Sequence, residues 1–214
     1  MPSFRPLELS ALPDTWRLFS ARKSDPGFQK FAQQVLVRDQ YTCQFCGFQA
    51  GQYQEVVNLD KNYYNNKLSN LVTACCFCAQ CFFLEAVGKD DYGGGVLIYL
   101  PEMTQGDLNG LCHVLFCAMA NAANYRNDAQ NVYRSFKLRS QIVEKQLGEG
   151  MSDPALFGRM LIDTPDAERQ QVKKDILSYL RLLPSHTKFG KQIDDWAKAA
   201  LEELAAEKKK QQSK

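Results

Sequence analysis

Histidine is scarce in this sequence: the 214 residues include two, His113 and His186, and both lie in the second half of the chain. Charge of one sign is also lacking, because 26 basic and 24 acidic residues leave a net charge of +2. Such a small excess creates no strong field toward nucleic acid or a membrane surface. These two deficits argue against histidine-based catalysis in the first half of the chain and against binding driven by overall charge.

Long hydrophobic stretches are absent as well. The least charged window, residues 71–84, is too short to span a bilayer and contains Gln80 and four cysteines. The N-terminus, MPSFRPLELSALPD, has prolines and acidic residues where a signal peptide would have an apolar core. We therefore expect a soluble, cytoplasmic protein. Hydrophobic residues, at 45%, are frequent enough to form a core.

Cysteine, by contrast, is concentrated in one region. Six of the eight cysteines fall between Cys43 and Cys81. In a chain of this size without a leader, two C-x-x-C pairs indicate metal ligands rather than disulfides. Zinc prefers four tetrahedral ligands, and two such pairs of thiolates close its coordination shell. We therefore predict one structural zinc ion, bound in part by Cys43 and Cys46.

The second pair can be chosen in two ways from spacing alone. Cys75-x-x-Cys78 and Cys78-x-x-Cys81 share Cys78, and Cys76 lies within the first of these pairs. Two other interpretations are weaker. Free cysteines are often small buried side chains, and a redox pair would require a surrounding βαβ pattern that this region lacks. The two remaining cysteines, Cys112 and Cys117, are five positions apart on a predicted helix and do not share a face. Both are expected in the core.

The hydrophobic pattern predicts an α+β fold in two parts. Residues 14–100 form the zinc-binding part, residues 101–205 form an α-helical part, and residues 206–214 form a disordered polar tail. The predicted strands are 16–20, 55–59 and 96–100, and the predicted helices of the first part are 27–38 and 78–87. The second part is predicted to be helical throughout, with an N-terminal cap at Thr104 and a helix over 129–147. Further helices are predicted to start at Pro154 and Pro165, and the last helix is predicted over 189–204. One of these helices is predicted to carry an apolar stripe of Val172, Ile176, Leu180 and Leu183.

One predicted helix could also contact nucleic acid, because basic and aromatic residues alternate along it. They are Arg126, Arg134, Lys137, Arg139, Lys145, Tyr125, Tyr133 and Phe136. Glu144 and Glu149 lie nearby, and the total charge is close to neutral. A solvated helix face is therefore the better interpretation, and no nucleic-acid partner is expected.

Residues 38–79 resemble the four-cysteine form of the HNH endonuclease motif. The matching segments are RDQYTCQFCG (38–47), VNLD (57–60), NN (65–66) and NLVTACCFC (70–78). The resemblance implies a treble-clef type ββα core, HNH-like, followed by a mainly α-helical region. It also implies that the zinc ligands are Cys43, Cys46, Cys75 and Cys78, with Cys81 on the following helix.

The catalytic groups of that motif are missing. Asn58 stands where the family has its general base, Val57 stands at a metal-ligand position, and Ala79 replaces the last histidine. Asn70 matches the family's middle asparagine. We therefore expect no enzymatic activity; a residual HNH nuclease or a zinc-dependent nucleic-acid-binding protein is the alternative.

Over residues 14–205 the chain is similar to the IcmJ/DotN family of subunits of the Dot/Icm type IVB secretion system. The resemblance rests on CQFCGFQA, VVNLD, LSNLVTACCFCAQCFF, DYGGGVLIYLPE, LCHVLFCA and SFKLRSQIVE. It implies a non-enzymatic, zinc-stabilised scaffold in bacterial protein transport and virulence. The implied partner is the cytosolic C-terminal extension of the coupling ATPase (DotL), with the adaptors IcmS and IcmW and the effectors as indirect partners. Contact with the inner membrane is implied only through that partner.

Overall fold

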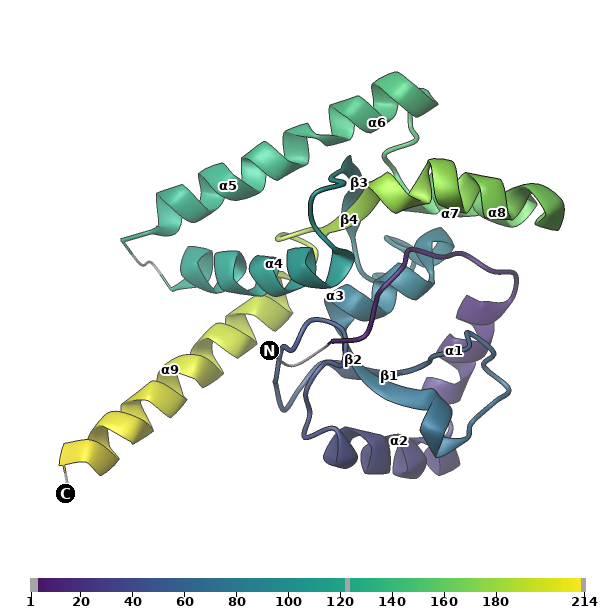
Figure 1. Ribbon diagram of the computed structural model, residues 1–214. Coiled ribbons are helices and arrows are strands. Elements are labelled where there is room, and N and C mark those ends of the chain that lie inside the picture. The colour runs from purple at the N-terminus through teal and green to yellow at the C-terminus, as the bar shows by residue number, and fades with distance from the viewer. Residues whose placement is uncertain (1–3, 122–123, 213–214) are drawn as a thin grey trace.

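The α-helices make up about half of the chain, and the strands form two small antiparallel sheets (Figure 1). The computed structural model describes residues 4–121 and 124–212. The helices are α1 (Thr15–Lys23), α2 (Pro26–Arg38), α3 (Cys76–Ala79), α4 (Gln105–Ala120), α5 (Arg126–Leu138), α6 (Ser140–Leu147), α7 (Pro154–Asp163), α8 (Asp166–Asp175) and α9 (Gly190–Gln212). The strands are β1 (Gln54–Asn58), β2 (Leu71–Cys75), β3 (Gly95–Tyr99) and β4 (Leu180–Pro184). The predicted α+β class is confirmed.

The first sheet pairs β1 with β2, and α2 packs against it. The helix begins where the Asp25 side chain accepts a hydrogen bond from the backbone N–H of Phe28, at 2.7 Å. Its buried Val35 packs with Val56 of β1 and Leu71 of β2 in a small separate core. Helix α2 and strand β1 agree with the helix predicted over 27–38 and the strand predicted over 55–59, whereas β2 was not predicted as a strand.

A strand is predicted over residues 16–20, and this prediction is wrong, because helix α1 covers the segment. Asp14, just before the helix, adopts a left-handed conformation that turns the chain into it. Phe19 and Arg22 are three positions apart, and both are buried. Burial therefore follows a helical period here, and five residues are too few to show this in the sequence.

The predicted helix over 78–87 is also interrupted. Helix α3 ends at Ala79, and two 3-10 turns follow, over Gln80–Phe82 and Leu84–Ala86. Phe83 separates them with φ −138° and ψ 56°, and its ring is fully buried, 4.5 Å from that of Phe19. The helix is interrupted here because burying the Phe83 ring in the core goes with a non-helical backbone at this residue.

The second sheet pairs β3 with β4, so the second half of the chain is not helical throughout. The helical stripe predicted from Val172 to Leu183 is wrong beyond the end of α8. In β4, Leu182 packs in one core cluster with Leu97, whereas Leu183 packs in the other with Ile98. A strand buried on both faces is a continuous apolar run, which periodicity cannot distinguish from a buried helix.

Helix α4 lies at the centre of the second half and contacts α3, α5, α9 and β4. The predicted cap holds, since the Thr104 hydroxyl accepts a hydrogen bond from the Asp107 N–H at 3.1 Å. The long helix predicted over 129–147 is two helices, α5 and α6, that meet at Arg139 and follow nearly one line in Figure 1.

The last helix, α9, extends away from the body of the molecule and continues to Gln212 (Figure 1). The predicted tail begins at residue 206, and its last two residues, 213–214, lie outside the described part of the chain. Among the described residues, no helix combines the length and apolarity needed to cross a bilayer.

Candidate metal centre

Four cysteine sulfurs converge at one point of the fold. Cys43, Cys46, Cys75 and Cys78 each offer a sulfur, and these four atoms all lie within 4.8 Å of one another. The sulfurs of Cys46 and Cys75, one from each C-x-x-C pair, are 3.6 Å apart. Four thiolates bound at about 2.3 Å to a tetrahedral ion are spaced about 3.8 Å from each other. The group therefore has the size and donor set that one tetrahedral metal ion requires.

A tight turn presents the first pair. The Gly47 N–H donates to the Cys43 carbonyl at 3.0 Å, and the Cys43 N–H donates to the Phe48 carbonyl at 2.9 Å. Gly47 has a φ of +78°, a conformation that L side chains rarely adopt. A Cβ there would also lie 2.4 Å from the ring of Phe4. Glycine is thus required both by the turn and by the N-terminal segment packed over it.

The second pair lies where a strand becomes a helix. Cys75 is the last residue of β2, with an extended ψ of 160°, and Cys78 is in the first turn of α3. The N–H of Gln44, inside the first turn, donates to the Thr73 carbonyl of β2 at 2.9 Å. This bond fixes the two C-x-x-C segments side by side, although they are about 30 residues apart in the sequence.

The other four cysteines, Cys76, Cys81, Cys112 and Cys117, lie outside this group. The Cys81 thiol donates to the Phe77 carbonyl at 3.4 Å, and Cys81 belongs to the second core cluster. Cys112 is buried in the main core, as expected from the sequence. The Cys117 sulfur accepts a hydrogen bond from the Asn121 amide at 3.3 Å. Of the two overlapping pairs that spacing left open, the structure brings Cys75 and Cys78 to the first pair.

The electrostatics of the group favour a bound cation. Burial raises the pKa of the Cys75 and Cys78 thiols well above their ordinary value. Burial also opposes ionisation of Cys43, but hydrogen bonds from the neighbouring thiols hold its pKa well below the ordinary value. One thiolate can thus be solvated by three thiols, whereas four thiolates in a buried site need a positive charge between them.

Two polar side chains of α4 reach the same sulfurs, and sequence reasoning missed them. The Asn109 amide nitrogen lies 3.2 Å from the Cys78 sulfur, and the His113 Nε2 lies 3.3 Å from the Cys75 sulfur. Gly106 and Gly110 occupy the same face of the helix, three positions before each of them. In the sequence these residues form a Gly-x-x-Asn-Gly-x-x-His pattern (106–113) in a mostly apolar helix, and this pattern could have indicated a polar face packed against another element.

Aromatic rings enclose the imidazole of His113. It stacks against Phe48 with ring centroids 3.6 Å apart, and against Phe77 at 4.2 Å. Trp196 of α9 meets it edge-on at 5.1 Å. Burial lowers the pKa of His113 to about 3, so the ring is neutral at physiological pH. The last helix is thereby packed onto the cysteine group.

The positions matched to nuclease groups serve the loop that follows β1. The Asn58 amide nitrogen donates to the Asn62 and Asn65 carbonyls at 2.8 and 2.9 Å. The Asn70 amide nitrogen donates to the Asp60 carboxylate at 2.8 Å and to the Asn65 carbonyl at 2.9 Å. These asparagines hold backbone and side-chain groups of the loop in place.

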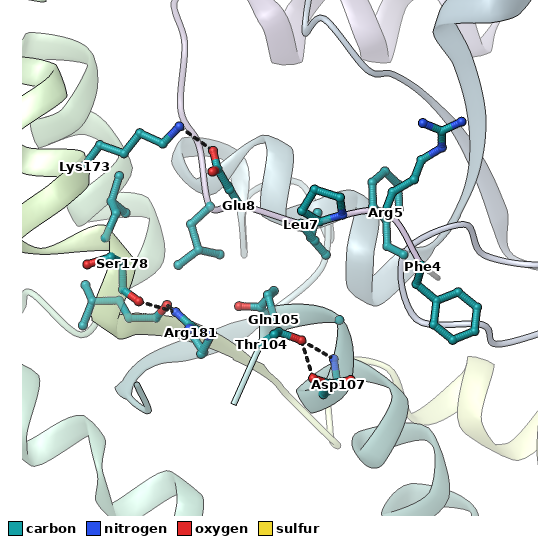
Figure 2. Close-up of a pocket in the computed structure, with 16 residues that line it drawn as sticks. Phe4, Arg5, Leu7, Glu8, Thr104, Gln105, Asp107, Lys173, Ser178 and Arg181 are labelled. Carbon is teal, nitrogen blue, oxygen red and sulfur yellow. Dashed lines mark hydrogen bonds and ion pairs between the residues drawn. The ribbon is translucent and has the colours of Figure 1, made fainter. Parts of the chain in front are cut away.

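A separate cavity of about 590 Å³ lies between the N-terminal segment, the start of α4 and the approach to β4 (Figure 2). Lys173 forms an ion pair there with Glu8 at 2.6 Å, and Arg181 donates to the Met103 carbonyl at 2.6 Å. Lys173, Glu8 and Arg181 are thus engaged within the chain. In the part of the chain that the structure describes, the converging metal-ligating side chains are the four cysteines, and they do not line this cavity.

Some of the basic and aromatic residues that could contact nucleic acid instead make contacts within the protein. The Tyr133 hydroxyl donates to the Pro184 carbonyl at 3.0 Å, and the Tyr133 ring meets Phe116 at 5.3 Å. Arg139 forms an ion pair with Glu102. The pattern therefore contains residues that attach α5 to the body of the protein.

Comparison with known proteins gives the family. No known family profile matches the chain. The chain is 60% identical over 199 residues to the Type 4 apparatus protein DotN of Legionella pneumophila subsp. pneumophila strain Philadelphia 1, and the match covers 93% of this chain and 92% of that protein. Identity at this level over nearly the whole of both chains shows common family membership and confirms the sequence resemblance. The chain therefore belongs to the DotN (IcmJ) family of the Dot/Icm type IV secretion apparatus.

Proposed function

We propose that this protein is a non-enzymatic scaffold subunit of a Dot/Icm type IVB secretion system, stabilised by one structural zinc ion. The observation that supports the scaffold role is the 60% identity to a protein named as part of a type 4 apparatus. The observation that supports the metal is the convergence of four cysteine sulfurs within 4.8 Å. Together they favour a protein that supplies a folded surface to an assembly.

Zinc is the ion that this donor set fits best. Four cysteine sulfurs in a tetrahedral arrangement are typical of structural zinc sites, in which no coordination position stays open for water or substrate. Cys43, Cys46, Cys75 and Cys78 would hold the ion. Bound there, zinc supplies the positive charge that lets four buried thiols ionise together, and its binding free energy becomes folding free energy.

The core around this site supports an HNH-like, treble-clef type assignment. A cysteine turn is followed by the antiparallel pair β1–β2 and then by α3, which carries the second cysteine pair. The zinc-binding part is proposed to span residues 14–100, and the helical part residues 101–205. The groups that the nuclease reaction uses are replaced, since Asn58, Val57 and Ala79 stand at those positions. On this assignment, the protein would retain the metal-binding frame of the motif without its general base.

We assign as partner the cytosolic C-terminal extension of the coupling ATPase DotL, with the adaptors IcmS and IcmW and the effectors reached through it. Attachment to that ATPase would also hold the protein at the cytoplasmic side of the inner membrane. Two sets of exposed apolar side chains offer docking surfaces: Tyr125, Val132, Leu138 and Ile142 along α5 and α6, and Leu201 and Leu204 on α9. Exposed apolar groups of this kind are typical contact points for partner chains.

Titration calorimetry of the zinc-loaded protein against the purified DotL extension tests the proposal. Binding should weaken only modestly between low and physiological salt, because apolar burial and a net charge of +2 provide little long-range attraction. Leu201→Lys with Leu204→Lys, and Leu138→Lys with Ile142→Lys, locate the docking surface. Glu202→Lys on α9 is the matched control for added charge.

The opposite outcome is equally clear. A folded, metal-loaded protein that ignores the extension but binds DNA or RNA, with affinity falling steeply as salt rises, would overturn the scaffold proposal. The nucleic-acid alternative would then replace it.

A further inference from the structure

One face of α4 lies directly against the cysteine group. A Cβ added to Gly106 would lie 2.5 Å from the Phe45 carbonyl oxygen, and one added to Gly110 would lie 3.4 Å from the Cys46 carbonyl oxygen. Gly106 therefore lets the helix approach the backbone of the first cysteine turn, and Gly110 lies one helical turn further along the same contact. Asn109 and His113 extend from this close-packed face to the sulfurs of the second pair.

The orientation of the Asn109 amide follows from a chain of hydrogen bonds. The backbone N–H of Leu182 donates to the Gln105 Oε1 at 2.8 Å, which identifies that atom as the oxygen of the amide. The Gln105 Nε2 then donates to the Asn109 Oδ1 at 3.0 Å. Asn109 therefore turns its NH₂ group toward Cys78, and its side chain is fully buried. The contact with β4 thus orients Gln105, and through it the Asn109 amide, so that an N–H group points to the Cys78 sulfur.

The proton on the His113 ring is placed by similar reasoning. Phe48 and Phe77 fix the plane of the imidazole from both sides. A metal-bound thiolate has no proton and can only accept a hydrogen bond. The Nε2 atom, 3.3 Å from the Cys75 sulfur, must therefore carry the ring proton.

We propose that Asn109 and His113 are positioning residues that donate N–H···S hydrogen bonds to the metal-bound thiolates of Cys78 and Cys75. This inference rests on the metal site of the proposed function and adds a specific outer layer to it. Four thiolates around one dication carry excess negative charge, and two donors withdraw part of it. The sulfurs become weaker nucleophiles, so the bound site resists alkylation and oxidation.

Cobalt substitution tests the inference, because the energy of the sulfur-to-cobalt charge-transfer band reports electron density on the sulfurs. The intact chain and its variants are loaded with CoCl₂, and the loaded proteins are then treated with iodoacetamide. Asn109→Leu removes the NH₂ group that faces Cys78, adds no charge and keeps a side chain of similar volume. His113→Phe keeps a ring between Phe48 and Phe77 and removes only the donor.

Asn121→Leu is the matched control, since Asn121 makes the same kind of contact with Cys117, outside the cysteine group. Asn109→Leu and His113→Phe should shift the charge-transfer band to lower energy and raise the alkylation rate about three- to tenfold each, the effect of one hydrogen bond. Asn121→Leu should match the unmodified protein in both measurements.

Two failures can be told apart. Unmodified protein without a tetrahedral cobalt–thiolate spectrum would refute the metal site itself. The role of the two donors alone would be refuted by a different result. In that case the unmodified protein has the spectrum, and the Asn109→Leu and His113→Phe variants match it in band energy and alkylation rate. If Asn109→Leu does not fold, His113→Phe, which retains the ring stack, decides the question by the same two measurements.

Discussion

The guanidinium group of Arg22 donates a hydrogen bond from Nη1 to the Oδ1 of Asn58, at 2.5 Å. Its Nη2 donates to the Val56 carbonyl at the same distance, and the rings of Phe28 and Tyr63 lie 4.3 and 4.6 Å from it. Arg22 comes from α1, which sequence periodicity did not identify. A buried cation therefore lies beside Asn58, the position that the sequence resemblance matches to the general base of the HNH motif.

We predict that the protein does not cleave DNA, and that Asn58→His does not create the activity. A histidine at position 58 would face the Arg22 guanidinium, which disfavours both a protonated imidazole and a catalytic cation beside it. Plasmid nicking is measured with magnesium, manganese and nickel. Nicking by the Asn58→His protein that is lost on adding Asn70→Ala would contradict the prediction.

Asn58→Ala should destabilise the protein by about 2–4 kcal/mol, because it leaves the buried Arg22 with fewer acceptors and frees the loop carbonyls that Asn58 binds. Urea unfolding of the metal-loaded protein measures the loss. Asn62→Ala is the control, since the Asn62 side chain is exposed and accepts from the Tyr64 N–H within the loop. Equal losses from the two substitutions would contradict a special role for the Arg22–Asn58 pair.

The metal prediction concerns individual cysteines. Cys43→Ser should abolish stoichiometric zinc binding and most of the native structure, because zinc binding at such sites contributes on the order of 10 kcal/mol to folding. Cys81→Ser replaces a buried thiol outside the group and should retain one zinc ion per chain with a smaller loss of stability. Mass spectrometry of metals and circular dichroism provide the readouts. A zinc-free but fully folded unmodified protein would contradict it.

The sequence allowed the cysteine group to be located because the relevant information is local. A C-x-x-C turn needs only four residues, and the position of Gly47 follows from its left-handed conformation. Asn109 and His113 depend on the packing of α4 against these turns, which no local pattern encodes. The sequence shows two polar residues and two glycines on one face of α4, but it does not show which element packs against that face.

The predicted elements failed where tertiary packing decides the conformation. Leu180 to Leu183 could continue a helical stripe, yet pairing with β3 makes the segment a strand buried on both faces. Phe83 divides a predicted helix because its ring belongs in the main core. The proposed division of the chain at residue 100 stays a prediction, although β3, in the first part, forms its sheet with β4, in the second.

Glu85 makes the stability depend on pH. Its buried Oε2 has no hydrogen-bond partner among the described residues, and burial raises the pKa of Glu85 from 4.5 to about 7. The unfolded chain ionises this carboxyl first, so the stability it contributes is complete below pH 4.5 and is lost as pH rises toward 7. Glu85→Gln should therefore stabilise the protein at pH 8 by roughly 1–3 kcal/mol, since one pKa unit corresponds to about 1.4 kcal/mol and solvent screens part of it.

The measurement compares unfolding of the unmodified and Glu85→Gln proteins, both metal-loaded, from pH 8 to pH 5.5, and the difference should shrink as pH falls. Glu144→Gln is a control whose effect should stay constant over this pH range. Hydrogen bonds from Ser152 and Gly150 lower the pKa of Glu144 from 4.5, so its contribution is present throughout this range and is lost only at more acidic pH. A Glu85→Gln effect that is constant with pH would contradict the assignment.

The close approach of α4 to the first cysteine turn gives a paired prediction at Gly106 and Gly110. Alanine at position 110 meets ordinary contact distances, and in a helix interior it is favoured over glycine by about 1 kcal/mol. Alanine at position 106 would place a methyl group 2.5 Å from the Phe45 carbonyl oxygen, so the turn or the helix must move. Overpacking of this kind costs about 1–3 kcal/mol.

We therefore expect Gly106→Ala to be destabilised and to release zinc faster to a chelator, and Gly110→Ala to be neutral or more stable with unchanged release. Phe45 lies between Cys43 and Cys46, so a shift of its carbonyl disturbs the geometry of both sulfurs, whereas a general weakening of α4 would affect stability without the same change in metal release. Urea unfolding and chelator competition on the same samples separate the two effects. If the two variants lose zinc at the same rate, the helix does not brace the metal centre through Gly106.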